Sequence, residues 1–495
     1  MSAPVPTGDE RPAGAPGGAP PPPASRSARR ELLASALLFV ALFAVYQSSE
    51  KRQLLDPKYA LLAADTLLAR GTWDLRPFFP ELRCVSERRA LRATGEAAPW
   101  QLGCRQGRIV YRYGPGTPLL SLPFVALARA AGRGVLDADG GSSRRGEIEL
   151  QAWLAALLTA ATGVLVGRAA RRELGVAASA GVGLAAGLGT TLWSVASRSL
   201  WAHTWSALLV AAIVVELLRW EEGRRRRPIV LGLLAVAAFW VRPTNAIVAG
   251  AVALFVALRH RRALGALVAT GAAGAAAYAL LTRHLSGELL PTFVTHVPGL
   301  FGRTSTLEAA AGLLVSPLVG LLVFTPVLVA IAVLLATLGV PERFRAVSLW
   351  ALAVVVAHYS MMARFGGWWG GGAMGPRFFT EMVPLWAWLG VAAWAGVARR
   401  TPAQSWRRRA TATALVALAF AGVVANGAVA TRLAGDYGRP RGELRQRLRM
   451  NQAPRAVWEW REAPYLAVWR ALVASPEQTK ARGLESRRGT RGRPR

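Results

Sequence analysis

The amino-acid sequence predicts an all-α polytopic protein that crosses a membrane many times. Of its 495 residues, 53% are hydrophobic, and the mean hydropathy is +0.30. Apolar runs recur along the chain, and many approach the roughly 20 residues that a bilayer-spanning helix needs. Short charged loops separate these runs, which is typical of a helical bundle rather than a transmembrane barrel.

We expect about 11 transmembrane helices, because each long apolar run can cross the bilayer once. They are placed near residues 31–46, 149–167, 174–196, 199–218, 228–241, 244–258, 263–282, 311–335, 346–362, 381–398 and 410–430. A cleaved signal peptide is the alternative for the first run, since Arg29-Arg30 resembles a twin-arginine signal. The many further spans favour an uncleaved anchor.

Positive charge assigns the two sides of the membrane, because short cytoplasmic loops carry an excess of Lys and Arg. Basic clusters fall at every second span boundary, beginning with Arg26, Arg29 and Arg30. The others are Arg168, Arg171 and Arg172; Arg224–Arg227; Arg259, Arg261 and Arg262; Arg343 and Arg345; and Arg399, Arg400 and Arg407–Arg409. The N-terminus is therefore predicted to be cytoplasmic. Residues 117–131 are expected to lie along the outer surface as a helix, because a span there would invert every later loop.

The formal net charge of +32 does not indicate a nucleic-acid partner. A nucleic-acid-binding protein gathers its basic residues on one soluble face, whereas here they punctuate apolar runs. Lys occurs only at positions 51, 58 and 480, so nearly all of the positive charge is Arg. Together with abundant Ala and Gly, this composition is typical of codon bias. The partner that the composition predicts is membrane lipid.

Composition also divides the chain into four parts. Residues 1–28 are rich in Pro, Gly and Ala and are expected to be a disordered cytoplasmic arm. Residues 29–430 form the predicted transmembrane domain, with 47–147 as a large first outer loop. Residues 431–478 are expected to form a short helical segment outside the membrane, and 479–495 a basic disordered tail.

The two cysteines, Cys84 and Cys104, both lie in the first outer loop. In an oxidising compartment they could close a loop of about 21 residues and contribute roughly 3 kcal/mol. The alternative is two unrelated thiols. The sequence contains no CxxC motif and no Cys/His cluster, so it does not support a zinc site.

Asp56 is the carboxylate best placed for chemistry. It opens the segment Asp56-Pro57-Lys58-Tyr59-Ala60, directly after the first span. An acidic residue at this exit can act on a lipid-linked substrate held at the interface, and Asp65 and Asp74 are competing carboxylates. Read alone, the residues favour a structural role, because Asp followed by Pro commonly begins a helix as its N-cap.

Aromatic and basic residues of the outer loops are candidates for substrate binding. They are Tyr59, Arg112, Tyr113, Arg198, His203, Arg242, Trp368, Trp369 and Arg377. Arg offers a bidentate fork to phosphate, and the glycines between Trp369 and Arg377 let backbone N–H groups approach an anion. Structural alternatives remain open: a simple turn after Tyr113, a core histidine at His203, and an interfacial aromatic belt at Trp368 and Trp369.

The order of these features resembles the GT-C superfamily of glycosyltransferases that use polyprenyl-phosphate sugars, particularly the bacterial relatives of protein O-mannosyltransferases and aminoarabinose transferases. The similar pieces are Asp56–Ala60, Tyr113–Gly116 with Pro118–Leu120, Arg242-Pro243, the stretch 312–326, and Trp368–Arg377. The resemblance extends over residues 30–430. Pro57 stands where the family often has a second acidic residue, so a paired-carboxylate or metal role is not carried over.

The resemblance implies a GT-C-like fold and an inverting transfer of a sugar from a polyprenyl-phosphate donor to a hydroxyl of a glycolipid, glycan or protein acceptor. It also implies an active site on the outer face of a bacterial cytoplasmic membrane. Asp56 would be the general base, and Arg377, Arg242 and Arg198, with Arg112 behind them, would stabilise the departing phosphate. No metal ligand is predicted, and dependence on a divalent cation is left open.

Two hypotheses from other classes stand beside this one. The chain could be a transporter or flippase for a lipid-linked glycan, or a catalytically inactive scaffold in envelope assembly. Transporters tend to show inverted repeats and helix-breaking or ionisable positions near the bilayer midplane. The predicted spans show no convincing repeat and carry their charges at the ends, which favours the enzyme.

Overall fold

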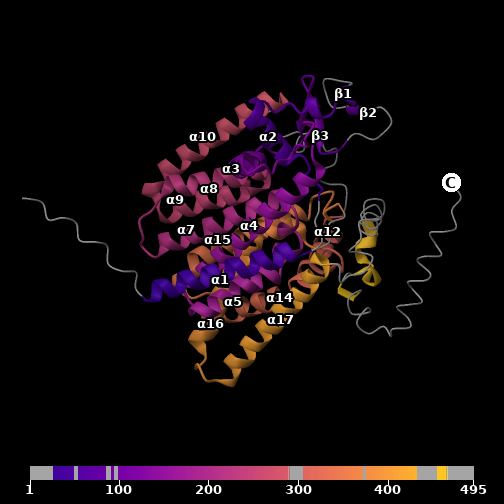
Figure 1. Cartoon of the computed structure of the whole chain (residues 1–495). Coiled ribbons are helices and arrows are strands. Elements are labelled where there is room, and N and C mark those ends of the chain that lie inside the picture. Colours follow the sequence, from indigo (N-terminus) through magenta and orange to yellow (C-terminus); the bar gives the residue numbers. More distant parts are fainter. Residues whose placement is uncertain are drawn as a thin grey trace, which may run out of the picture.

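The chain folds as a bundle of helices with a small β region at one end (Figure 1). This computed structural model describes residues 26–49, 54–84, 91–93, 99–287, 289, 305–371, 375–431, 454–463 and 465–466. The α-helices are α1 (Arg26–Ser48), α2 (Ala60–Arg70), α3 (Gly116–Ala130), α4 (Arg144–Ala170), α5 (Val176–Leu188), α6 (Thr191–Ser194), α7 (Ala202–Glu221), α8 (Pro228–Val241), α9 (Ala246–Arg259), α10 (Arg261–Ser286), α12 (Thr306–Val315), α13 (Leu321–Phe324), α14 (Val327–Leu338), α15 (Glu342–Met362), α16 (Val383–Arg400) and α17 (Trp406–Ala430). The strands are β1 (Leu82–Cys84), β2 (Leu91–Ala93), β3 (Leu102–Arg105) and β4 (Arg108–Tyr111), and the 3-10 helices are η1 (Arg76–Phe78), η2 (Ala196–Arg198), η3 (Pro243–Asn245), η4 (Arg377–Met382), η6 (Pro454–Trp458) and η7 (Trp460–Glu462).

Seven helices of the described chain are long and apolar enough to cross a membrane. They are α1 from Ala28, α4, α7, α10 up to Leu285, α15, the continuous η4–α16 segment, and α17. α5 and the α6–η2 segment make an eighth candidate if they form one span that bends by 47°. Shorter apolar helices accompany them at α3, α8, η3–α9, α12 and α14. The chain therefore has the helices of a multi-pass membrane protein.

Most of the predicted spans fall on these helices, and three fall on shorter ones. The runs at 228–241 and 244–258 coincide with α8 and α9, which have 14 residues each. The apolar run 311–335 is interrupted: α12 ends before Ser316-Pro317, and α14 begins after Pro326. Proline lacks the backbone N–H and clashes with the preceding helical turn, so the two prolines divide the run. The total of eleven spans stays a prediction, as does the position of α3 along the outer surface.

The first loop contains two short antiparallel hairpins, β1–β2 and β3–β4, which the all-α prediction did not include. Gln106 and Gly107, between β3 and β4, both have positive φ, 47° and 72°. Positive φ at both central residues is typical of the type I′ turn, whose twist matches that of the flanking strands. A disulfide between Cys84 and Cys104 joins β1 to β3. Strands of three or four residues are too short to show a clear alternating pattern in the sequence.

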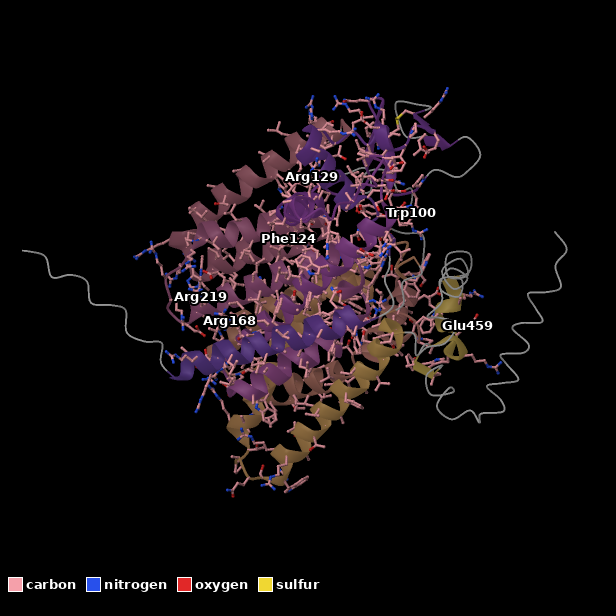
Figure 2. All side chains as sticks on the ribbon, viewed as in Figure 1. Trp100, Phe124, Arg129, Arg168, Arg219 and Glu459 are labelled. Atoms are coloured by element: carbon pink, nitrogen blue, oxygen red, sulfur yellow. A yellow bond between two sulfur atoms is a disulfide. The ribbon has the colours of Figure 1, made fainter. Side chains whose placement is uncertain are left out.

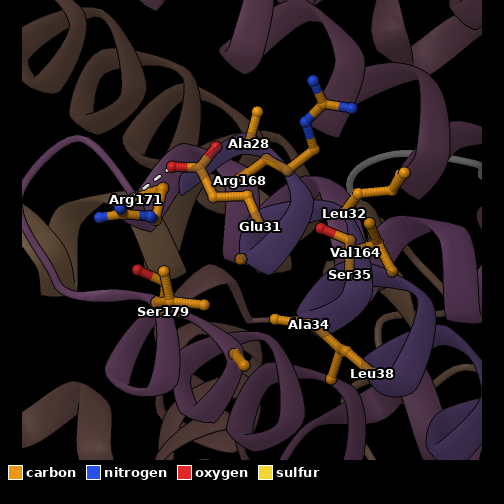
Figure 3. A pocket seen from close by; sticks show the side chains of 13 residues that line it. Ala28, Glu31, Leu32, Ala34, Ser35, Leu38, Val164, Arg168, Arg171 and Ser179 are labelled. Carbon is orange, nitrogen blue, oxygen red and sulfur yellow. Dashed lines mark ion pairs between the residues drawn. The ribbon is translucent and has the colours of Figure 1, made fainter. Parts of the chain in front are cut away.

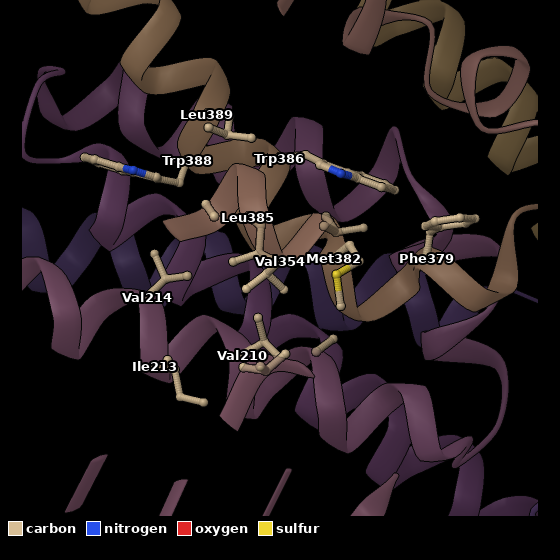
Figure 4. Close-up of a cluster of buried hydrophobic side chains, with 14 of the residues drawn as sticks. Val210, Ile213, Val214, Val354, Phe379, Met382, Leu385, Trp386, Trp388 and Leu389 are labelled. Carbon is tan, nitrogen blue, oxygen red and sulfur yellow. The ribbon is translucent and has the colours of Figure 1, made fainter. Parts of the chain in front are cut away.

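The largest buried apolar cluster of the described residues includes a part formed by α7, α15 and the η4–α16 segment (Figure 4). Val210, Ile213 and Val214 contribute from α7, where spacings of three and four residues place side chains on one face of a helix. Val354 of α15 and Leu385 of α16 face them. This packing holds the start of α7 against η4, where the candidate site lies.

Glycines bring α1, α4 and α5 into close contact. A Cβ on Gly183 of α5 would lie 2.6 Å from the carbonyl oxygen of Gly163 on α4. A Cβ on Gly187 would lie 2.6 Å from Leu42 on α1. Small residues at helix contacts allow the backbones of membrane helices to approach closely.

The predicted cytoplasmic loops gather at one end of the bundle. Figure 2 shows Arg168 and Arg219 at this end and Trp100 and Glu459 at the other. Ion pairs connect the loops: Arg171 with Glu31, Arg172 with Glu222, Arg259 with Glu221, and Arg343 with Glu173. The Arg clusters found at every second span boundary therefore lie together at one end of the fold, which we call the basic end. Its assignment to the cytoplasm stays a prediction.

The terminal parts lie largely outside the described residues. Most of the predicted arm 1–28 and the whole of the predicted tail 479–495 are not among the described residues. Of the segment 431–478, the described residues include η6 and η7. The domain boundaries stay predictions.

Candidate active site

A cavity of about 480 Å³ lies at the end of the bundle opposite the basic end. It is found where α7 begins and α15 ends, whereas the basic end is where α7 ends and α15 begins. Its charged or titratable wall residues are Asp56, His203, Arg242 and Arg377, and its aromatic wall residues are Tyr111, Tyr113, Trp201, Phe365, Trp369 and Phe378. The volume is within the range of small-molecule sites.

Asp56 and Arg377 form an ion pair on the wall of this cavity. Oδ2 of Asp56 lies 3.0 Å from Nη1 of Arg377. Tyr111 donates a hydrogen bond to the backbone carbonyl of Asp56, and Gln151 donates one to that of Pro57, at 3.0 and 2.8 Å. Burial raises the pKa of Tyr111 well above its usual value, so the hydroxyl remains a donor. These contacts hold the Asp56-Pro57 backbone beside the cavity.

The N-cap alternative for Asp56 is wrong for the following helix, α2. Glu147 takes that role, because its two carboxylate oxygens accept hydrogen bonds from the backbone N–H groups of Leu61 and Leu62, both at 3.1 Å. The residue that precedes α2, Tyr59, has a φ of 74° and makes no side-chain cap. The carboxylate of Asp56 is therefore available to the cavity rather than to the helix.

The guanidinium of Arg377 is fixed by aromatic rings and by the glycine-rich loop. It lies 5.0 Å from the ring centres of both Trp201 and Phe378, an arrangement that stabilises a cation. Gly370 has a φ of 80°, and a Cβ there would lie 3.2 Å from Nε of Arg377. Gly371 also has a positive φ, 64°. The glycines allow the loop to fold directly over the Arg377 side chain.

A second charged cluster, formed by Glu381, Arg242 and His203, lies behind this pair. Glu381 is fully buried, and its two oxygens contact Arg242 and Nδ1 of His203, the latter at 2.6 Å. Nη1 of Arg242 is also 3.1 Å from Nδ1 of His203. Nε2 of His358 lies 3.9 Å from Glu381 and 2.8 Å from the carbonyl oxygen of Phe378. Glu381 therefore supplies the countercharge that keeps Arg242 inside the protein.

Glu381 is not among the site residues predicted from the sequence. The signal that could have identified it is an acidic residue just inside a predicted span, because ionisable groups in spans usually face a partner or a cavity. Glu147 and Gln151 were not predicted either, and for them the sequence gives no local signal. They lie on α4, and only the fold brings them to the start of α2.

Six of the predicted residues line the cavity: Asp56, Tyr113, His203, Arg242, Trp369 and Arg377. Four do not, namely Tyr59, Arg112, Arg198 and Trp368. Tyr59 packs edge-to-face against Phe79. Arg198 is buried and donates to the carbonyl oxygen of Ala430. Trp368 is buried against Gly312, where a Cβ would lie 2.1 Å from its ring.

The competing carboxylates are also placed elsewhere. Asp65 is buried and pairs with Arg129 at 3.3 Å. Asp74 pairs with Arg76 at 2.6 Å and accepts a hydrogen bond from the backbone N–H of Ile109. Neither lines the cavity. Among the carboxylates predicted for chemistry, Asp56 alone faces it within the described part of the chain.

The loop Tyr113–Gly116 reaches the cavity because its glycines lie directly on the end of α8. A Cβ on Gly116 would lie 2.3 Å from the carbonyl carbon of Trp240 and the nitrogen of Val241. A Cβ on Gly114 would lie 3.0 Å from the carbonyl oxygen of Trp240. This close approach brings Tyr113 to the wall of the same cavity as Arg242, the residue that follows α8.

No protein-family model matches the chain, and no curated protein matches it. Among solved structures, the chain is similar to ArnT from Cupriavidus metallidurans bound to undecaprenyl phosphate. The TM-score is 0.48 at 14% identity, covering 88% of this chain and 75% of that chain. The apo oligosaccharyltransferase of Archaeoglobus fulgidus also has a TM-score of 0.48, at 13% identity. That match covers 85% of this chain and 59% of the archaeal one.

The described residues contain no group of three or more His, Cys, Asp or Glu side chains that could hold a metal ion. What the cavity does offer is one carboxylate, two guanidinium groups and several aromatic rings. A carboxylate can accept a proton from a hydroxyl, and guanidinium groups bind phosphate oxygens through paired N–H donors.

Proposed function

We propose that this chain transfers a sugar from a polyprenyl-phosphate donor to an acceptor hydroxyl at the outer face of a bacterial cytoplasmic membrane. The observation that carries the proposal is that Asp56, Arg242 and Arg377 share one cavity of a multi-pass membrane protein. Such a transfer needs a base for the acceptor and positive charge for the leaving phosphate. The cavity wall contains a carboxylate for the first requirement and two guanidinium groups for the second.

Asp56 is the proposed general base. Its carboxylate accepts the proton of the acceptor hydroxyl while the acceptor oxygen attacks the anomeric carbon. The bond between that carbon and the phosphate oxygen breaks as the new glycosidic bond forms, and the polyprenyl phosphate leaves with the bonding electrons. Attack from the face opposite the phosphate inverts the anomeric configuration. The protonated Asp56 then releases its proton to water.

Arg377 and Arg242 are the proposed phosphate-binding residues. Arg377 is paired with Asp56 in the structure, and a phosphate competes with that carboxylate for the same guanidinium donors. When Arg377 turns to the phosphate, Oδ2 of Asp56 is released for the acceptor proton. Arg242 remains held by Glu381 and adds a second positive charge to the cavity.

The remaining walls fit the two ends of the donor. Met361 and Met362 at the end of α15, and Phe365 just after it, provide an apolar wall for the first isoprene units. Tyr113 and Trp369 provide aromatic surfaces for the sugar. Pockets with mostly apolar walls and a few polar groups orient a ligand in this way.

The test uses purified protein with a panel of labelled polyprenyl-phosphate sugars, with and without an envelope extract that supplies acceptors. Release of free polyprenyl phosphate that depends on the extract, together with the label in a new product of inverted configuration, is the expected result. Unchanged donor under all conditions, from protein that remains folded, would contradict the proposal and favour a transporter, flippase or inactive scaffold.

A further inference from the structure

A second pocket lies at the basic end, far from the candidate active site. It has a volume of about 260 Å³ and is lined by residues of α1, α4 and α5 (Figure 3). Glu31, Arg168 and Arg171 form its charged wall, and the hydroxyl groups of Ser35 and Ser179 also line it. Leu38 forms part of its apolar wall. The pocket thus joins a charged region at the helix ends to the apolar side of the bundle.

The charges around this pocket are not balanced. Arg171 pairs with Glu31 at 3.0 Å and donates from Nη1 to the carbonyl oxygen of Leu174 at 2.6 Å, as seen for the ion pair in Figure 3. Its Nε is buried without a hydrogen-bond partner. Arg168 is exposed, and within the described residues its guanidinium has no hydrogen bond or ion pair. One carboxylate therefore faces two arginines, and one buried donor is left unsatisfied.

An unsatisfied buried donor carries a free-energy cost that a suitable acceptor removes. The acceptor that fits here is an anion, because the wall already has an excess of positive charge. A phosphate oxygen can accept from the exposed Arg168 while another reaches the guanidinium of Arg171, where a small turn of the side chain brings Nε to the pocket surface. Glu31 can keep its own pair with Arg171 in this arrangement, since that pair uses a different nitrogen.

The position of the pocket indicates that the anion carries acyl chains. The pocket lies beside α1, of whose apolar window only 17% is buried inside the fold. Leu32 of α1 lines the pocket and is 73% exposed, so this helix presents apolar surface beside the charged wall. In a membrane, that surface contacts lipid tails, and the basic loops lie at the level of the head groups.

We infer that this pocket binds an anionic phospholipid of the membrane, with its phosphate between Arg168 and Arg171 and an acyl chain along α1. Basic pockets between transmembrane helices are known to hold anionic head groups. The inference is independent of the proposed sugar transfer, because the pocket and the candidate active site lie at opposite ends of the bundle. Bound lipid would stabilise the packing of α1 against α4 and α5 at the basic end.

The experiment counts lipids bound to the full-length protein by native mass spectrometry, with phosphatidylglycerol and phosphatidylcholine of identical acyl chains, and with inorganic phosphate as a third probe. Arg168→Glu reverses the charge of the site, and Ser35→Trp fills the pocket without changing its charge. Arg225→Glu is the matched control, because Arg225 is an exposed residue of the same end and has no ion pair in the described chain. Thermal unfolding in lipid-free detergent checks that each variant is folded.

We expect phosphatidylglycerol to bind the natural protein more tightly than phosphatidylcholine. Arg168→Glu should weaken this binding at least about tenfold, whereas Arg225→Glu should change it about twofold or less. Ser35→Trp, if folded, should also abolish the tight binding. Equal losses in Arg168→Glu and Arg225→Glu, equal binding of the two lipids, or full displacement by inorganic phosphate would each overturn the inference. None of these measurements uses transfer activity, so their failure leaves the proposed function untouched.

Discussion

Oδ2 of Asp56 lies 3.0 Å from Nη1 of Arg377, although 321 positions separate the two residues in the chain. Asp56 follows α1, the first described helix, and Arg377 begins the η4–α16 segment, so the contact joins early and late parts of the helical bundle. The side chains of Asp56 and Arg377 are only 24% and 14% exposed. Partial burial makes their charges interact more strongly with each other, and with a bound ligand, than charges in water do.

Asp56→Asn should abolish transfer while the protein remains folded. The amide keeps the size of the carboxylate and can still accept from Arg377, but it cannot take a proton from an acceptor hydroxyl. Loss of a positioned base typically lowers the rate by roughly 100- to 10,000-fold. The measurement is the release of polyprenyl phosphate at saturating donor. Asp139→Asn is the control, because Asp139 is exposed in the same loop and does not line the cavity. Full activity of Asp56→Asn would remove Asp56 from the mechanism.

Arg377→Lys should weaken donor binding even though the charge is kept. Lysine lacks the planar fork that binds two phosphate oxygens and cannot stack in the same way against Trp201 and Phe378. Loss of a hydrogen bond to a charged group typically costs about 1.5–3 kcal/mol of binding free energy. We therefore expect the KM for the donor to rise about 10- to 100-fold. Arg112→Lys is the matched control, since Arg112 does not line the cavity. Similar effects of the two substitutions would show that Arg377 has no special role.

Asp56 illustrates how far the sequence could predict the site. Its position after an apolar run, together with the order of later motifs, indicated a functional carboxylate, but the local Asp-Pro pattern favoured an N-cap. The cap comes instead from Glu147, 86 positions from Leu61, and no local pattern can reveal such a partner. Helices were predictable because apolar runs of sufficient length form them in any bilayer. Contacts between distant residues depend on packing that the pattern does not encode.

Arg198 and Trp368 were predicted as site residues but do not line the cavity, which shows the same limit of sequence-based prediction. By residue type and position they resembled Arg377 and Trp369, yet both are buried away from the cavity. Arg198 is turned toward the end of α17 by the carbonyl group of Ala430, and Trp368 fills the space that Gly312 leaves on α12. Which of two adjacent tryptophans faces the cavity is decided by the direction of the loop backbone.

Glu381→Gln should destabilise the fold, because Glu381 does not line the cavity but holds Arg242. Arg242 would remain buried with its charge uncompensated, and breaking a buried ion pair in this way costs about 3–5 kcal/mol. We therefore expect a clearly lower midpoint of thermal unfolding in detergent. The double variant Glu381→Gln/Arg242→Gln should recover part of this loss, because no unpaired charge remains. Glu149→Gln, which alters an exposed ion pair with Arg145, is the control and should leave the midpoint almost unchanged. An unchanged midpoint in Glu381→Gln would contradict the role of Glu381 as the countercharge.

Gly116→Ala should displace Arg242 without touching its side chain. The added Cβ would lie 2.3 Å from two backbone atoms at the end of α8, and backbone cannot move aside as a flexible side chain can. The end of α8 must shift, and Arg242 follows it directly in the chain. We expect a lower midpoint of thermal unfolding together with a higher KM for the donor. Gly103→Ala is the matched control, because a Cβ on Gly103 meets nothing within 4 Å. If the two alanine variants have the same midpoint and the same KM, the loop does not rest on α8, and the glycines of this motif serve only the turn.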